Sequence, residues 1–158
     1  MKSFVFGVLI GAIGMGALVW TQMPRLMLTV HESKLPFDET VSAIEESAKT
    51  HGWKVPKIYD IQKTVREEGH DDLGDVKILS LCQPHHAYRI LKYDENKKVS
   101  AMMPCRIGVF ATADGAVHIA EMNIGLLSKL FGGLIAEVMG GVASEEKAII
   151  ADIVKAPE

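Results

Sequence analysis

The sequence predicts an α+β domain, in which helices pack on one face of an antiparallel sheet, preceded by one N-terminal transmembrane helix. Three observations support this fold class. The chain starts with a long uncharged segment, short β-branched runs then alternate with amphipathic helical patterns, and Asp114-Gly115 marks a tight hairpin between two of those runs. Because strands and helices are mixed and a hairpin is present, an antiparallel sheet with segregated helices is favoured.

The first segment, residues 1–24, is interpreted as a transmembrane anchor. No charged residue lies between Ser3 and Pro24, and about 20 apolar residues suffice to cross the hydrocarbon core. A cleaved signal peptide is the alternative, but the apolar run is longer than a usual signal core and lacks a good Ala-x-Ala cleavage site. We therefore expect a single-pass protein of the cytoplasmic (inner) membrane, in contact with membrane lipid, whose domain 25–158 lies on the periplasmic side.

The amino-acid composition argues against several classes of function for that domain. Charged residues form 23% of the chain and apolar residues 48%, and the net charge is -3 without a basic cluster. No nucleic-acid partner is expected, because phosphate contacts need clustered Lys and Arg. Two cysteines are too few for a disulfide framework or for a zinc ribbon made of cysteine alone.

The first half of the domain is expected to contain a strand at 25–31, a helix at 36–51, a strand at 53–61, a charged helical turn at 63–68 and a polar loop at 69–75. Pro36 opens the first helix, which carries apolar residues at three- and four-residue steps, and Gly52 suits its C-terminal cap. Pro56 interrupts the second strand and so places it at a sheet edge or at a bulge.

The second half is expected to contain strands at 76–82, 103–111 and 117–121 and helices at 84–93, 124–141 and 145–155. Pro84 fits the first position of its helix, where a missing N–H does no harm. Asn123 can cap the helix at 124–141. Lys129 and Glu137 within that helix argue against a second membrane span.

Two short stretches concentrate the groups that can bind a soft metal or perform thiol chemistry: Cys82-Gln83-Pro84-His85-His86 and Met102-Met103-Pro104-Cys105. Cys82 ends one predicted strand and Cys105 begins another, so antiparallel pairing would bring both to one end of the sheet. The helix that starts after Cys82 would favour its thiolate. Cα atoms more than about 10 Å apart would contradict this arrangement, since such a pair could not share a site.

The same residues carry a resemblance to a known family. Cys82-Gln83-Pro84-x-x-Ala87, then Pro104-Cys105-Arg106 and Asp114-Gly115, resembles the domain-of-unknown-function 302 (DUF302) family over roughly residues 29–123. In that family the pattern is roughly Cys-Asn-Pro, a helix, then Leu-Pro-Cys and a strand, so Gln83 and Met103 depart from it. The resemblance implies a small α+β domain that tends to form dimers, and we therefore expect a homodimer.

Binding of a soft metal or haem is the function that these stretches favour. Thiolates, thioethers and imidazoles are ligands of copper, zinc and haem iron. The expected metal ligands are Cys82, His85, Cys105, Met102 and Met103, and the expected cofactor-binding residues are His85 and His86. Cys-x-x-Cys-His does not occur, so covalent haem attachment is not expected. Such a protein would serve as an accessory to a membrane redox complex.

Two alternatives stay open. Outside the cytoplasm the two cysteines could form a disulfide in a structural interaction domain. A thiol at Cys82 or Cys105 could instead perform sulfur or disulfide exchange with a neighbouring histidine as base, although no third group orients that base and no catalytic residue is assigned. Adjacent carboxylates such as Glu145-Glu146 are interpreted as solvated faces, because neighbouring residues point apart on a helix.

Overall fold

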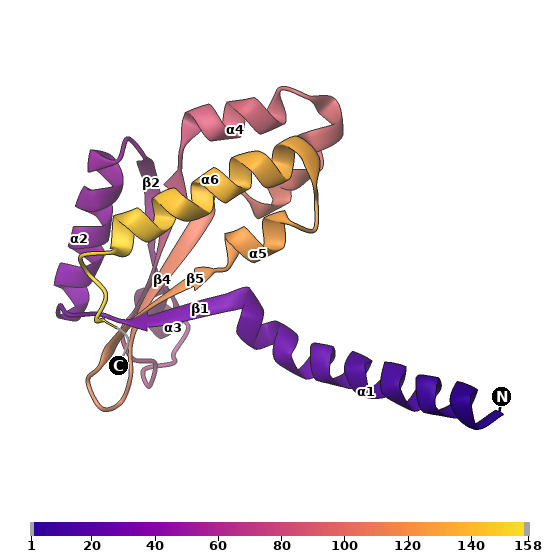
Figure 1. Ribbon diagram of the computed structural model, residues 1–158. Coiled ribbons are helices and arrows are strands. Elements are labelled where there is room, and N and C mark those ends of the chain that lie inside the picture. Colours follow the sequence, from indigo (N-terminus) through magenta and orange to yellow (C-terminus); the bar gives the residue numbers. More distant parts are fainter. Residues whose placement is uncertain (1, 157–158) are drawn as a thin grey trace.

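The domain is built on one five-stranded sheet with the order β1-β5-β4-β3-β2 (Figure 1). The computed structural model describes residues 2–156, without the side chains of residues 2–10, 12, 13 and 24. The strands are β1 (Leu28–Glu32), β2 (Lys54–Asp60), β3 (Val76–Cys82), β4 (Cys105–Ala111) and β5 (Val117–Met122). Every neighbouring pair is antiparallel, which confirms the α+β class with an antiparallel sheet.

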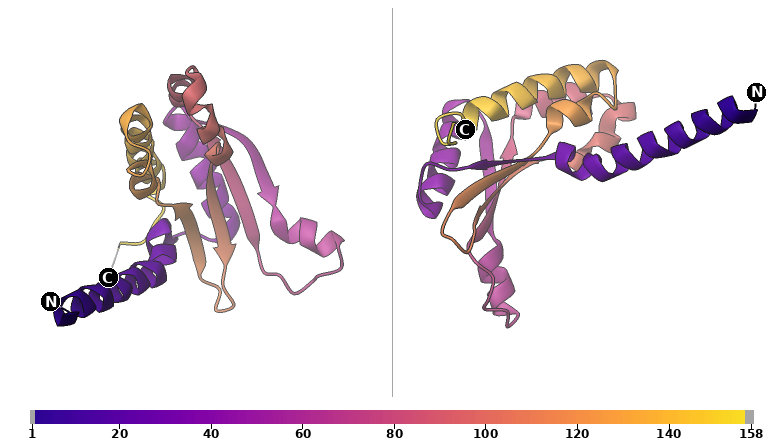
Figure 2. Two further views of the ribbon diagram at one scale, coloured as in Figure 1. Left: turned by 90° about the vertical axis from the view of Figure 1, so that its right-hand side faces the viewer. Right: turned by 60° about the horizontal axis from the view of Figure 1, so that its bottom comes forward.

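Six α-helices and a 3₁₀-helix complete the part of the chain that the structure describes. They are α1 (Lys2–Met27), α2 (Phe37–Thr50), α3 (Ile61–Glu67), α4 (Pro84–Leu91), the 3₁₀-helix η1 (Asp94–Met102), α5 (Ile124–Ser128) and α6 (Gly133–Ile150). Helices α2, α4 and α6 contact one another or the sheet from the same side, while α3 extends from the far end of β2 and β3 (Figure 2).

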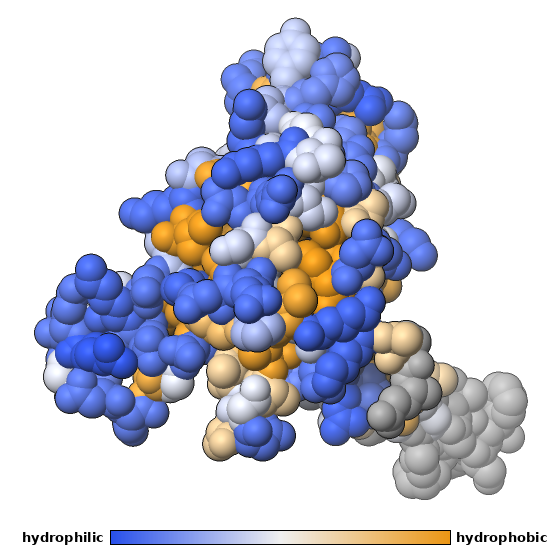
Figure 3. All heavy atoms as spheres, turned by 90° about the vertical axis from the view of Figure 1, so that its left-hand side faces the viewer, coloured by the Kyte–Doolittle hydropathy of each residue, from blue (hydrophilic) through white to orange (hydrophobic). Residues whose placement is uncertain are grey.

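The strand register explains why the helices cover one face. Leu79 lies opposite Ile107 and Val109 lies opposite Ile119, and all four side chains are buried beneath the helices. On the other face, Val30 remains 54% exposed. Burying each of the core aliphatic side chains contributes about 1.5–3 kcal/mol, so this two-sided pattern fixes the register. Figure 3 shows the surface from the left-hand side of Figure 1. On this face, hydrophobic residues gather near the centre and hydrophilic residues lie around them.

Several local predictions are confirmed. Helix α2 begins directly after Pro36, and Gly52 beyond its end adopts a φ of +79° that favours glycine. Strand β2 lies at the sheet edge, and its register shifts between Lys54 and Lys57, around the predicted irregularity at Pro56. Asn123 caps α5 by accepting a hydrogen bond from the Leu126 N–H.

Other boundaries were predicted wrongly. The helix expected at 124–141 is broken, because Gly132 and Gly133 adopt φ values of +68° and +53° and separate α5 from α6. Helix α6 then continues through Ser144, where a new helix was expected, since helical hydrogen bonding outweighs the cap preference of one serine. The strand expected at 25–31 starts only at Leu28, because α1 continues to Met27.

Helix α1 is a single helix of 26 residues that projects away from the sheet (Figure 1). Its final part exposes large apolar side chains, among them Leu18 at 59% and Trp20 at 83%. The predicted span at residues 1–24 falls partly on side chains outside the described set. A search of the described residues finds no helix both long enough and apolar enough to cross a membrane. The membrane anchor therefore stays a prediction.

Candidate functional site

The structure brings both cysteines to the same end of the sheet. Strands β3 and β4 pair antiparallel, with Leu81 directly opposite Cys105. Opposed Cα atoms are about 5 Å apart and consecutive ones about 3.8 Å, so the Cα atoms of Cys82 and Cys105 are separated by at most about 9 Å. This confirms the predicted meeting of the two stretches.

A small cavity of about 40 Å³ lies between this strand end and helices α4 and α6. Its lining includes the side chains of Cys82, His86, Met103, Cys105 and Met139. Both cysteines are free thiols. Among the residues that the structure describes, no group of three or more His, Cys, Asp and Glu side chains is arranged to hold a metal ion.

A second cavity, of about 150 Å³, adjoins the first and shares Met103, Cys105 and Met139 with it. The residues that line it include one cysteine and four methionines, namely Cys105, Met102, Met103, Met122 and Met139. We call the two adjoining cavities the sulfur site. Three of the predicted ligands, Cys105, Met102 and Met103, thus line one cavity together with Met122 from β5 and Met139 from α6.

The two histidines differ in their surroundings. His86 Nε2 lies 2.8 Å from Glu145 Oε1, and the Trp53 indole N–H donates to Glu145 Oε2 over 2.8 Å. Burial acts to raise the pKa of Glu145, but the hydrogen bonds from His86 and Trp53 outweigh it and the pKa is lowered. His86 therefore helps join α4 to α6, whereas its buried Nδ1 has no partner among the described residues. His85 is exposed and lines neither cavity of the sulfur site.

Cys105 is a protonated thiol in this environment. Burial, together with the charge and hydrogen bonding of the nearby Glu146 carboxylate, raises its pKa far above the ordinary value. Burial likewise raises the pKa of Glu146 to about 7, and the Glu121 carboxylate adds to the shift, while the contact with Cys105 opposes it. At the sulfur site, burial thus favours the thiol form of Cys105 over its thiolate.

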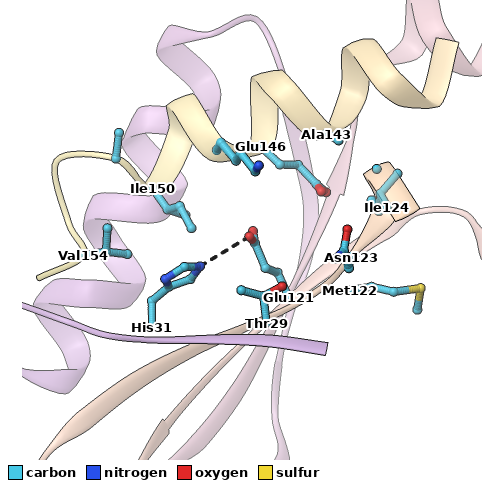
Figure 4. Close-up of a pocket in the computed structure, with 13 residues that line it drawn as sticks. Thr29, His31, Glu121, Met122, Asn123, Ile124, Ala143, Glu146, Ile150 and Val154 are labelled. Carbon is cyan, nitrogen blue, oxygen red and sulfur yellow. Dashed lines mark ion pairs between the residues drawn. The ribbon is translucent and has the colours of Figure 1, made fainter. Parts of the chain in front are cut away.

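A larger cavity of about 430 Å³ lies next to Glu146, between α6 and strands β1 and β5. His31 and Glu121 extend from the strands and Glu146 from the helix above them (Figure 4). His31 Nε2 is 3.7 Å from Glu121 Oε1, and Glu121 Oε2 is buried without a hydrogen-bond partner in the described part of the chain. We call this space the acidic cavity.

The solvated-face interpretation of Glu145-Glu146 was wrong. Glu146 is only 4% exposed, because the turn of α6 that carries it also buries Val142, Ile149 and Ile150. Glu121 was also missed, although it follows Val117 and Ile119 at two-residue steps and so lies on their buried face. Both positions could have been found from the apolar periodicity around them.

Comparisons with known proteins identify the family. The model of the family described as "Domain of unknown function DUF302" matches residues 29–156, which extends the resemblance at 29–123 to the end of α6 and beyond. The solved "uncharacterized conserved protein DUF302 from Bacillus stearothermophilus" is similar in fold, with a TM-score of 0.71 and 23% identity over 79% of this chain and 96% of that one. No curated protein matches the chain. The family match covers the whole sheet and all helices after α1, so the chain belongs to the DUF302 family.

Proposed function

We propose that this protein binds a soft metal ion, specifically Cu(I), at the sulfur site. The observation that carries the proposal is that Cys105 and four methionines are among the residues that line one cavity. Thioether and thiolate sulfur are soft ligands that select Cu(I), whereas zinc prefers several thiolates, imidazoles or carboxylates. Among copper, zinc and haem, Cu(I) therefore matches this set of side chains best.

Cavity size supports an ion over a haem group. The two parts of the sulfur site measure about 40 and 150 Å³. Pockets for organic ligands and cofactors usually occupy about 300–1,000 Å³. A single ion needs much less space, and methionine side chains are flexible enough to close around it.

The ligands nearest this cavity would be Cys105 with Met102, Met103 and Met139. Cys82 and the unpartnered Nδ1 of His86 line the adjoining cavity and could complete the coordination after a small movement. Metal binding must remove the proton from Cys105, so affinity is expected to increase with pH. His85, which is exposed, would contribute only by a larger rearrangement of the start of α4.

Thiol or disulfide exchange is the alternative function. It draws support from the proximity of Cys82 and Cys105 at one strand end. A nucleophilic cysteine requires a thiolate, and burial beside Glu146 raises the Cys105 pKa instead. For this reason metal binding remains the preferred proposal.

The setting we propose is the periplasmic side of the cytoplasmic membrane. The uncharged sequence from Ser3 to Pro24 and the exposed apolar side chains at the end of α1 support an anchor there. A soft-metal site held near a lipid surface suits an accessory of a membrane redox complex. The expected homodimer stays a prediction.

Titration with Cu(I) under anaerobic conditions tests the proposal. The full chain in mild detergent, with reduced thiols, should take one Cu(I) per chain from a chromogenic chelator. Cys105→Ser combined with Met103→Leu should weaken that binding at least 100-fold, because two of the shared ligands are lost. Met23→Leu on α1 is the matched control and should bind as the wild type does.

Equal Cu(I) affinity in the double variant and the wild type would contradict the proposal. Zinc or haem bound in a one-to-one ratio, with Cu(I) excluded, would assign a different metal. Absence of free thiols in the unfolded, unreduced protein, combined with no metal uptake after reduction, would favour the structural disulfide.

A further inference from the structure

The acidic cavity has no role in the proposed copper function, and one of its acceptors, Glu121 Oε2, has no donor among the described residues. Two buried carboxylates face it, Glu121 from β5 and Glu146 from α6, with exposed fractions of 8% and 4%. The His31 imidazole reaches Glu121 Oε1 at 3.7 Å, which is too long for a good hydrogen bond. Among the described residues no N–H or O–H group donates to Glu121 Oε2.

Burying a carboxylate oxygen without a donor is costly, and proteins rarely retain such a group without a use for it. Core packing does not explain why a carboxylate stands here. Glu121 lies on the same buried face of β5 as Val117 and Ile119, which are apolar. The side chain instead lines an accessible cavity of about 430 Å³, which lies within the range of small-molecule sites. A missing donor is therefore expected to come from a bound molecule.

The walls indicate what kind of molecule this is. Apolar side chains from Ile124, Ile150 and Val154 line the cavity around the carboxylates. The charged and titratable groups that face it are His31, Glu121, Glu146 and Lys147, with Lys147 exposed at the rim. These apolar walls suit the hydrocarbon part of an organic molecule better than the water shell of a hydrated divalent cation.

We infer that the cavity between α6 and strands β1 and β5 binds a small organic cation, with a primary ammonium group between Glu121 and Glu146 and a short apolar body against the isoleucines. An ammonium group supplies three N–H donors together with a positive charge. Rotation of the Glu121 carboxylate would bring Oε2, which is closed to solvent in this structure, into a charge-assisted hydrogen bond with that group. This site adjoins the sulfur site, because Met122 and Ile124 line both and Glu146 contacts Cys105.

The test uses n-butylamine as the probe and 1-butanol as its uncharged analogue. Amide chemical shifts of the ¹⁵N-labelled full chain in detergent are followed at pH 8 while each compound is added. We expect n-butylamine to produce saturable shifts around Gly125 and Ala143, which line the cavity. 1-Butanol should bind at least tenfold more weakly, because it lacks the charge.

Two isosteric variants and one control make the result specific. Glu121→Gln and Glu146→Gln should each weaken n-butylamine binding at least tenfold. Glu137→Gln, on the exposed side of the same helix, should leave it unchanged. The amide spectrum shows whether each variant folds. If either Glu121→Gln or Glu146→Gln fails to fold, the other still decides the test.

Three outcomes would overturn the inference. Equal affinity for n-butylamine and 1-butanol would show an apolar cavity without cation recognition. Unchanged amine binding in a folded Glu121→Gln or Glu146→Gln variant would place the amine elsewhere. Shifts at Gly125 and Ala143 with zinc, but none with n-butylamine, would assign a metal to the cavity. Loss of copper binding in Cys105→Ser with retention of amine binding would leave this inference intact, so the two proposals fail separately.

Discussion

Glu146→Gln is expected to change how the stability of the protein depends on pH. Glu146 is 4% exposed, and burial with the charge of Glu121 raises its folded-state pKa from the ordinary value of 4.5 to about 7. Because each pKa unit is worth about 1.4 kcal/mol, ionising this buried carboxyl costs the folded state about 3 kcal/mol. Glutamine preserves the shape of the neutral acid and removes the ionisation.

The sign of the effect follows from the raised pKa. Between pH 4.5 and 7 the folded state binds the Glu146 proton more tightly than the unfolded state does, so unfolding becomes easier as the pH increases. The cost is absent below about pH 4.5 and complete above about pH 7. The wild type should therefore lose about 3 kcal/mol relative to Glu146→Gln between pH 4.5 and pH 8.

Urea unfolding of the full chain in detergent, measured at both pH values, gives this difference directly. Titrating groups that are distant from Glu146 affect the wild type and the variant nearly equally, so their contributions cancel, and the coupling to Glu121 is part of the measured difference. Glu137→Gln, whose carboxylate is 68% exposed on the same helix, should show no such change. A constant difference between the wild type and Glu146→Gln across this pH range would refute the argument that Glu146 is buried in the folded protein.

Three further predictions test other parts of the site and fold. Cys105 should react with iodoacetamide far more slowly in the folded than in the unfolded protein at pH 8, as followed by mass spectrometry in a Cys82→Ser background, because burial raises its pKa. Glu145→Ala should lower the free energy of unfolding by about 1–3 kcal/mol, measured in urea, since it leaves two donors without their acceptor. Gly132→Ala should lower the free energy of unfolding by about 1–3 kcal/mol, because its backbone angles (φ +68°, ψ -178°) are unfavourable for alanine. Gly141→Ala, at an open position within α6, should instead raise the free energy of unfolding by up to about 1 kcal/mol.

The fold could be predicted well where local signals and burial agree. Pro36, Pro56 and Asp114-Gly115 each fix a boundary or an edge through backbone restrictions, and the structure has the corresponding features. The break between α5 and α6 was missed because the apolar pattern continues across Gly132, and only the backbone conformation shows that the helix stops. Sequence periodicity does not report positive φ values.

The candidate site was predicted only in part for a related reason. Cys82 and Cys105 were placed together because strand pairing can be inferred from two neighbouring strands. Met139 joins them from α6, which is distant in sequence and packs across the strand end only in the folded chain. Glu121 and Glu146 were overlooked because each was judged by its charge alone. The apolar periodicity of the neighbouring positions was not taken into account.

The charge balance around Glu146 also favours a monovalent metal at the sulfur site. Deprotonating Cys105 creates a negative charge beside a buried carboxylate, which burial already makes hard to ionise. Cu(I) carries one positive charge and so cancels the thiolate, while neutral thioethers add none. Zn²⁺ would require a second anionic ligand for the same balance, from Cys82 or from Glu146, which already contacts Cys105. The proposed Cu(I) would need no second anion and would leave both carboxylates available to the neighbouring cavity.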